Sequence, residues 1–268
     1  MALALFWVGC SVDSAKNRYL LAEKLWSEAN YAAAVVEFDR VNRRDPDGEL
    51  GRRALLRSAM TQTLFLNEHD EAIRKLRLIV DQEGDSRLGW DARKQIGEIL
   101  YTRQDKHSES IQHYQELVRL RPQAPEVPEF LYRIADSYFQ GWAFDSALEV
   151  FDRIQKECAG TPWAEKASYQ LGMVWLTRGE QRPGSRFSSQ EKETYREAIR
   201  LFEAFTQKYP KSVQVPEATF GIAVALEELD QLDQALSVLE TIQSTYPTPN
   251  VVQIRRIRLK ERISRRRR

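Results

Sequence analysis

The chain has 268 residues, of which 29% are charged and 42% hydrophobic, with a formal net charge of +1. This composition is ordinary for a folded chain with a large core, and the small numbers of Gly (12) and Pro (10) favour long helices over a turn-rich β-sandwich. The two cysteines, Cys10 and Cys158, lie far apart, which excludes a disulfide framework and a zinc site of paired cysteines.

The chain begins with the apolar run MALALFWVG, followed by Cys10 and Ser11. This run is too short to span a bilayer, which takes about 18 apolar residues, and no later run approaches that length. Residues 7–10 (WVGC) resemble the box that ends a bacterial lipoprotein signal, where a small residue precedes the cysteine that receives the lipid. This resemblance implies that residues 1–14 are a lipoprotein signal-like leader and tether, with lipidation and membrane contact at Cys10. The alternative is an apolar stub that packs on the rest of the fold.

Between residues 15 and 248, a small residue followed four positions later by a bulky one recurs six times. The six segments are YAAAVVEF (31–38), HDEAIRKL (69–76), HSESIQHY (107–114), FDSALEVF (144–151), YREAIRLF (195–202) and LDQALSVL (232–239), with small residues at Ala34, Ala72, Ser110, Ala147, Ala198 and Ala235. Upstream of each segment, apolar residues recur at three- and four-residue steps, which predicts a partner helix. Prolines mark the ends of several second helices, at Pro46, Pro122, Pro210 and Pro247.

The small residue predicts a close crossing of two helices, and the bulky residue one turn later fills the space to the next pair. One pair cannot bury its own apolar face, so the pairs stack. This pattern resembles the tetratricopeptide repeat (TPR) family. The resemblance implies an all-α fold, a right-handed α-solenoid of about six TPR helix–turn–helix units plus a C-terminal capping helix. Residues 15–248 would form this one solenoid domain.

The fifth repeat contains extra residues in the polar stretch 178–194, RGEQRPGSRFSSQEKET. We expect an exposed loop there, either a contact point or a tolerated insertion.

Residues 249–268 predict a capping helix and a basic tail. We expect Val251, Ile254 and Ile257 to cap the stack and residues 265–268 to fray. The cations of this tail include Arg255, Arg256, Arg258, Lys260, Arg262 and Arg265. The tail contacts an anionic surface or an acidic partner, or is simply a solvated terminus. Nucleic acid is disfavoured, because the rest of the chain is acidic and lacks a broad basic face.

The sequence offers little chemistry for catalysis. The histidines His69, His107 and His113 have no carboxylate or cysteine at metal-ligand spacing, and no phosphate-binding loop or nucleophile motif occurs. We therefore expect no enzyme activity, metal, cofactor or small-molecule substrate.

The TPR resemblance implies that the first helices of the repeats line a groove for partner proteins or extended peptides. Aromatic side chains with a few cations suit such a groove, since they are enriched at binding hot spots. The groove positions are Tyr19, Trp26, Arg57, Phe65, Lys94, Tyr101, Tyr132, Phe139, Tyr169 and Phe220. Part of this set could equally belong to the core between repeats.

The lipoprotein-like box, the repeat spacing and the linker of the segment 195–218, YREAIRLFEAFTQKYPKSVQVPEA, together resemble the BamD (YfiO) family of outer-membrane lipoproteins. The resemblance implies a non-enzymatic scaffold on the periplasmic side of the bacterial outer membrane, which binds a β-barrel protein and its substrates during outer-membrane protein assembly. The alternatives are a CpoB-like envelope coordinator, a pilus or motility lipoprotein, and a soluble cytoplasmic adaptor that binds peptides.

Overall fold

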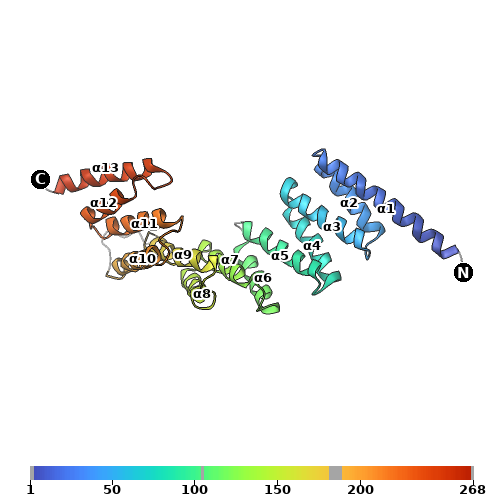
Figure 1. The fold of residues 1–268 in the computed structure, drawn as a ribbon, viewed down its shortest axis with the longest axis horizontal. Coiled ribbons are helices and arrows are strands. Elements are labelled where there is room, and N and C mark those ends of the chain that lie inside the picture. The colour runs from blue at the N-terminus through green and yellow to red at the C-terminus, as the bar shows by residue number, and fades with distance from the viewer. Residues whose placement is uncertain (1–2, 104–105, 181–188, 267–268) are drawn as a thin grey trace. The chain divides into compact units, whose positions relative to one another are not determined.

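The computed structural model describes residues 3–103, 106–180 and 189–266, with the backbone alone for residues 3–14 and 189–191. These residues form thirteen α-helices and a short π-helix, and among them there is no β-strand (Figure 1). The chain divides into two compact units, Met1–His113 and Tyr114–Arg268.

The helices are long and their connections short. In the first unit they are α1 (Leu3–Ser27), α2 (Tyr31–Arg44), α3 (Glu49–Thr61), the π-helix η1 (Gln62–Leu66), α4 (His69–Glu83) and α5 (Arg87–Thr102), and α6 (His107–Leu120) includes the boundary. In the second unit they are α7 (Val127–Gln140), α8 (Phe144–Glu157), α9 (Pro162–Glu180), α10 (Ser189–Lys208), α11 (Val215–Glu228), α12 (Leu232–Thr241) and α13 (Pro249–Arg266). In chain order the first twelve make six pairs, as predicted, and the fold is an α-solenoid.

The core is built on the small and bulky positions that recur in the sequence. All six small residues, on the even-numbered helices α2 to α12, are 0% exposed. The bulky residues four positions later are at most 2% exposed; they are Phe38, Leu76, Tyr114, Phe151, Phe202 and Leu239. The predicted register is therefore confirmed in each of the six repeats.

The packing around Phe202 of α10 shows how closely the helices approach. A Cβ atom added at Gly172 of α9 would lie 2.5 Å from Cδ1 of Phe202, and one added at Gly221 of α11 would lie 2.6 Å from Cε2. Such distances are shorter than van der Waals contact. The ring thus fills the space between two backbones that glycine alone leaves open.

The turns within the pairs share one geometry. Ala29, Trp142 and Asp230 all have φ values between 59° and 66°, and each is followed by a residue whose N–H bonds to the carbonyl five positions earlier, the C-terminal cap that a left-handed residue permits. In the second pair Asn67 has φ 56°, and Glu68 N–H reaches six positions back, to Gln62. The π-helix η1 therefore adds one residue to an otherwise common turn.

The predicted insertion loop 178–194 is shorter than expected. Helix α9 continues to Glu180 and α10 begins at Ser189, while residues 181–188 lie outside the described residues. Gly179 and Thr194, which we expected in the exposed loop, are buried. An added Cβ at Gly179 would lie 2.7 Å from the Tyr195 ring, so the two helices pack against each other in the place predicted for a loop.

The predicted face of the capping helix is wrong. Val251, Ile254 and Ile257 are 45%, 51% and 51% exposed, whereas Val252 and Leu259 are fully buried. These two residues are seven positions apart on one face of α13, toward the core that includes α11 and α12. The expected fraying is also wrong for residues 265 and 266, which are helical.

Helix α1 begins at Leu3, so the backbone of the predicted leader and tether is helical and continuous with the first repeat. The side chain of Cys10 lies outside the described residues. Lipidation at Cys10 stays a prediction.

We expect Ala147→Leu to lower the free energy of unfolding by about 1–3 kcal/mol, because Ala147 is fully buried at a helix crossing with no room for three more carbons. Thermal unfolding measures the effect. The control is Ala32→Leu, at an exposed position of α2, which should leave the melting temperature nearly unchanged. Equal melting temperatures for wild type and Ala147→Leu would contradict the close crossing.

Candidate partner-binding surfaces

Four of the ten predicted groove residues meet in the first unit. Tyr19 and Trp26 lie seven residues apart on one face of α1, and Arg57 of α3 and Phe65 of η1 lie beside them. The Trp26 ring meets the Phe65 ring edge-on at 5.8 Å between centroids, and Tyr31, which we did not predict, stacks on Phe65 at 4.0 Å. We call Tyr19, Trp26, Tyr31, Arg57 and Phe65 the N-terminal aromatic cluster.

Arg57 is held in place by Glu23 of α1. Its Nε and Nη2 donate to the two carboxylate oxygens at 2.9 and 2.8 Å, and its guanidinium lies 4.7 Å from the Trp26 ring centroid. The hydrogen bond to Glu23 raises the pKa of Arg57. Burial is the main cause that raises the pKa of Tyr19, and the negative charge of Glu23 is the second. The charge of Arg57 is therefore neutralised, and the cluster presents a fixed aromatic surface.

The π-helix sets which side chains of the cluster reach solvent. Phe65 is 43% exposed and its neighbour Leu64 is 67% exposed. Gln62, where η1 begins, is buried, and its side-chain amide donates to Glu68 at 2.8 Å. The π turn thus carries two exposed large apolar side chains, and one of them, Phe65, lies against the Trp26 and Tyr31 rings, as a partner-binding surface requires.

The second surface is a pocket of about 280 Å³ in the second unit. We call it the C-terminal pocket; its lining comes from α11 and α13 and consists of Phe220, Glu227, Val251, Ile254, Arg255 and Arg258. Arg255 donates to Glu227 at 2.8 Å and lies 5.4 Å from the Phe220 ring centroid. Phe220 is the one predicted groove residue at this pocket.

Other predicted groove residues of the second unit belong largely to the core. The centroid of the Tyr169 ring lies 5.9 Å from that of Phe202 and 5.7 Å from that of Phe205. Burial, followed by the negative charge of Glu217, raises the pKa of Tyr169 to about 12. Tyr132 packs on Phe151 and accepts a hydrogen bond from Gln170 at 3.2 Å. The bond between Tyr132 and Gln170 joins α7 to α9 of the next pair, whereas the Tyr169 ring packs within its own pair, α9 and α10.

The remaining three predicted residues do not join either surface. Phe139 packs on Phe144 at 6.2 Å, within the pair α7 and α8. Lys94 forms an ion pair with Asp91 at 3.0 Å on the same helix, and Tyr101 is half-buried on α5.

The basic tail is a helix whose charges are largely neutralised by the preceding pair. Glu227 pairs with Arg255 and Arg262, Asp230 pairs with Arg266 at 2.5 Å, and Glu240 pairs with Arg256 at 3.0 Å and Lys260 at 3.7 Å. Five cations of the tail are therefore paired within the chain, although Lys260, Arg262 and Arg266 stay 45–56% exposed. Contact of the tail with an anionic surface or a partner stays a prediction. Arg258 and Arg265 form no ion pair among the described residues.

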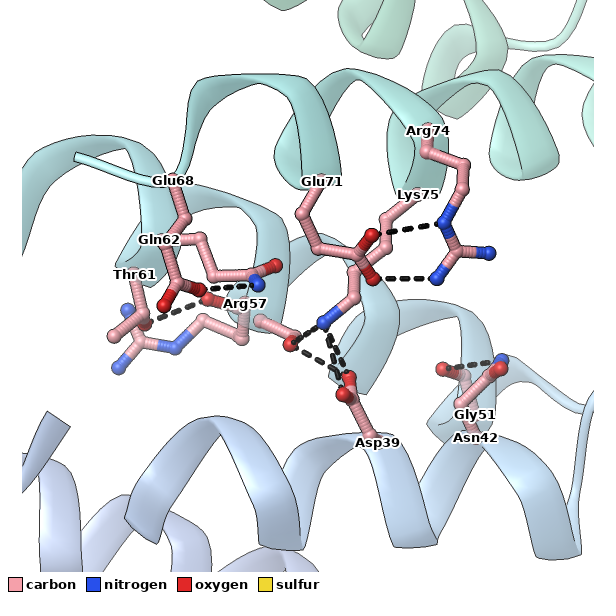
Figure 2. A network of polar contacts seen from close by, with 11 residues as sticks. Asp39, Asn42, Gly51, Arg57, Thr61, Gln62, Glu68, Glu71, Arg74 and Lys75 are labelled. Atoms are coloured by element: carbon pink, nitrogen blue, oxygen red, sulfur yellow. Dashed lines mark hydrogen bonds and ion pairs between the residues drawn. The ribbon is translucent and has the colours of Figure 1, made fainter. Parts of the chain in front are cut away.

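One polar cluster in the first unit has residue types that also occur in catalytic sites. Figure 2 shows Lys75 of α4 reaching Asp39 of α2, with distances of 2.8 and 2.9 Å from Nζ to the carboxylate oxygens. Lys75 also donates to Ser58 of α3 at 2.8 Å, and Ser58 donates to Asp39 at 2.7 Å. Because Ser58 and Lys75 are 0% and 3% exposed, a substrate cannot reach them, and the cluster joins three helices instead.

The described residues give no other sign of a chemical site. Within them no group of three or more His, Cys, Asp or Glu side chains could hold a metal ion. None of the described helices has both the length and the apolarity needed to cross a membrane.

Comparison with protein families identifies the repeat type. The profile of a family described as outer membrane lipoprotein, YfiO, matches residues 95–237, more than half of the chain. The chain belongs to the YfiO family. A tetratricopeptide repeat profile matches residues 63–125, so the predicted TPR fold is confirmed. No curated protein matches the chain.

Solved structures share the fold at low sequence identity. A tetratricopeptide repeat protein from Parabacteroides merdae has a TM-score of 0.59 and 17% identity, covering 94% of this chain and 88% of its own. PilW, described as a widely conserved type IV pilus biogenesis factor, has a TM-score of 0.55 and 15% identity, with coverages of 90% and 97%. PilF of Pseudomonas aeruginosa has a TM-score of 0.52 and 14% identity, with coverages of 92% and 99%.

We expect Asp39→Ala to lower the free energy of unfolding by roughly 3 kcal/mol or more, because it leaves the Lys75 ammonium buried without its counter-charge. Lys75→Met should cost less, since it removes the buried charge itself. The double variant should be more stable than Asp39→Ala alone, which chemical denaturation of the three variants measures. If the two single losses simply add, the proposed coupling is absent.

We expect the acidic partners of α13 to stabilise the fold at neutral pH and to lose this effect in acid. The hydrogen bond from Arg266 lowers the pKa of Asp230, and the one from Arg256 lowers the pKa of Glu240. A carboxyl group whose pKa is lowered by folding adds stability above its unfolded pKa, about 4, and loses it as the pH falls through the folded pKa.

The double variant Asp230→Asn/Glu240→Gln should therefore unfold more easily than wild type at pH 7, and the difference should shrink toward zero below about pH 4. Urea unfolding across this pH range measures it. Glu261→Gln, which removes an exposed carboxylate of α13 itself, is the control. A difference that is constant with pH would show that the carboxylates do not dock α13.

Proposed function

We propose that the protein is a lipid-anchored, non-enzymatic scaffold of the bacterial cell envelope, a BamD-like adaptor that binds partner proteins in outer-membrane β-barrel assembly. The observation that carries this proposal is the membership of residues 95–237 in the family of outer membrane lipoproteins. Cys10, preceded by Gly9 and an apolar run, is the residue that would receive the lipid. The anchor faces the periplasm in this proposal.

The two surfaces support a role in protein binding. The N-terminal aromatic cluster exposes Phe65 beside the Trp26 ring, against which Glu23 holds Arg57, and the neighbouring Leu64 is also exposed. Rigid aromatic side chains offer large contact areas at low entropic cost, as binding hot spots do. The C-terminal pocket adds a second, charged contact site. Partners are therefore proteins with extended or helical apolar segments, and neither nucleic acid nor a small-molecule substrate.

A second candidate is a role in pilus biogenesis. It is favoured by the shared fold with PilW, which is described as a type IV pilus biogenesis factor. Both candidates place a TPR lipoprotein in the envelope, so they differ in the partner. Deleting the gene separates them: loss of β-barrel proteins from the outer membrane supports the first, and loss of pili with normal β-barrel levels supports the second.

We expect the wild-type protein, produced with its native upstream region, to fractionate with outer membranes, and Cys10→Ala to release it. Cys158→Ala is the matched control, since Cys158 is buried in the second unit and should not affect anchoring. Mass spectrometry should find a mature chain that starts at Cys10 and carries diacylglycerol and acyl groups. A wild-type chain with an unmodified N-terminus, found in the cytosol, would overturn the envelope scaffold in favour of a cytoplasmic adaptor.

A further inference from the structure

The charges of α13 are unevenly compensated. Five of its seven described cations pair with Glu227, Asp230 or Glu240, and Arg258 and Arg265 form no ion pair among the described residues. Of these two, Arg258 lines the C-terminal pocket and Arg265 does not. One uncompensated guanidinium thus lies at the edge of a pocket.

The lining of the pocket also includes an apolar part. Phe220, Val251 and Ile254 supply the apolar surface, and Val251 and Ile254 are 45% and 51% exposed. The volume of about 280 Å³ lies at the lower end of ligand pockets, which range from about 300 to 1,000 Å³, so one or two side chains fill it.

Glu227 does not make the pocket repel anions. Glu227 of α11 accepts hydrogen bonds from Arg255 and Arg262, which both lie on α13, so its negative charge is more than balanced. The lining therefore holds two guanidiniums against one carboxylate. The excess positive charge lies on Arg258, and it complements a carboxylate beside an apolar group.

We propose that the C-terminal pocket binds a short segment of a partner protein in which an apolar side chain lies next to a carboxylate. The apolar side chain occupies the space between Phe220, Val251 and Ile254, and the carboxylate pairs with Arg258. This inference rests on the proposed scaffold function and specifies the chemistry of one partner contact.

Two other occupants fit the charges less well. An anionic lipid surface attracts clusters of free cations, yet five of the seven cations of α13 are already paired. A second copy joined by a two-fold axis through this face would bring identical uncompensated positive charges together.

The test uses a library of random heptapeptides displayed on phage and selected on the immobilised full chain. Enriched peptides should carry an aliphatic or aromatic residue next to Asp or Glu, and fluorescence polarisation then gives their affinity. Arg258→Glu should weaken binding about ten-fold or more, the loss of one charge-assisted contact. Ile254→Asp should weaken peptide binding as well, because it places a charge in the apolar part of the lining.

Arg265→Glu is the matched control, because Arg265 of α13 is also exposed and has no ion pair among the described residues, but does not line the pocket. It should leave the affinity unchanged. Selection repeated on Arg258→Glu should enrich Lys or Arg in place of Asp or Glu, a reversal that a merely structural role would not produce. Circular dichroism checks that each variant keeps its helices.

The inference is overturned if no peptide is enriched, if enriched peptides lack acidic residues, or if Arg258→Glu binds them as wild type does. It is also overturned if Arg258 is needed instead for binding to phosphatidylglycerol vesicles, or if Ile254→Asp abolishes a dimer seen by sedimentation. Peptide binding by a chain that stays in the cytosol would preserve the pocket and overturn the envelope role, so the two failures are distinguishable.

Discussion

The close helix crossing at the small residue of each even-numbered helix, α2 to α12, is the constraint on which the fold depends. A residue with no more than a methyl or hydroxymethyl group lets two backbones approach, and the bulky residue one turn later then fills the remaining volume. Phe202 shows the limit of this packing, since Gly172 and Gly221 leave its ring no space for even one added carbon on either side. Repeating this arrangement builds the core clusters within each of the two compact units, which a single helix pair could not form.

Because the core uses the small and bulky positions of these helices, other side chains are free to vary at the surface. The π-helix η1 is a local departure from the common turn, and it lengthens the first helix of one pair by a residue without disturbing Ala72 or Leu76. At this turn Phe65, whose ring meets Trp26, and its neighbour Leu64 are exposed. The candidate surface of the first unit thus lies where the repeat deviates, and π-helical turns are frequent at functional sites.

The repeat register could be predicted from sequence because it depends on residues four positions apart on one helix. The exposed face of α13 could not be predicted in this way. The helix has two apolar faces, formed by Val251, Val252, Ile254, Ile257 and Leu259. Acidic residues more than ten positions away in the sequence pair with its cations and select which face is buried. The N-terminal cluster was partly predictable: Glu23 lies between Tyr19 and Trp26 on the same face of α1. That Tyr31 stacks on Phe65 depends on the π turn, which no sequence motif announced.

The orientation of helix α13 depends on both ion pairs and apolar burial. Ion pairs on both of its flanks fix its rotation, with Glu227 and Asp230 on one side and Glu240 on the other. Exposed ion pairs add little stability individually, but several together select one orientation over another of similar apolar burial. The orientation they select buries Val252 and Leu259 and turns Ile254 and Arg258 outward. The same charges that close the solenoid therefore create its C-terminal pocket, and they leave there the one cation of the lining that has no partner within the described chain.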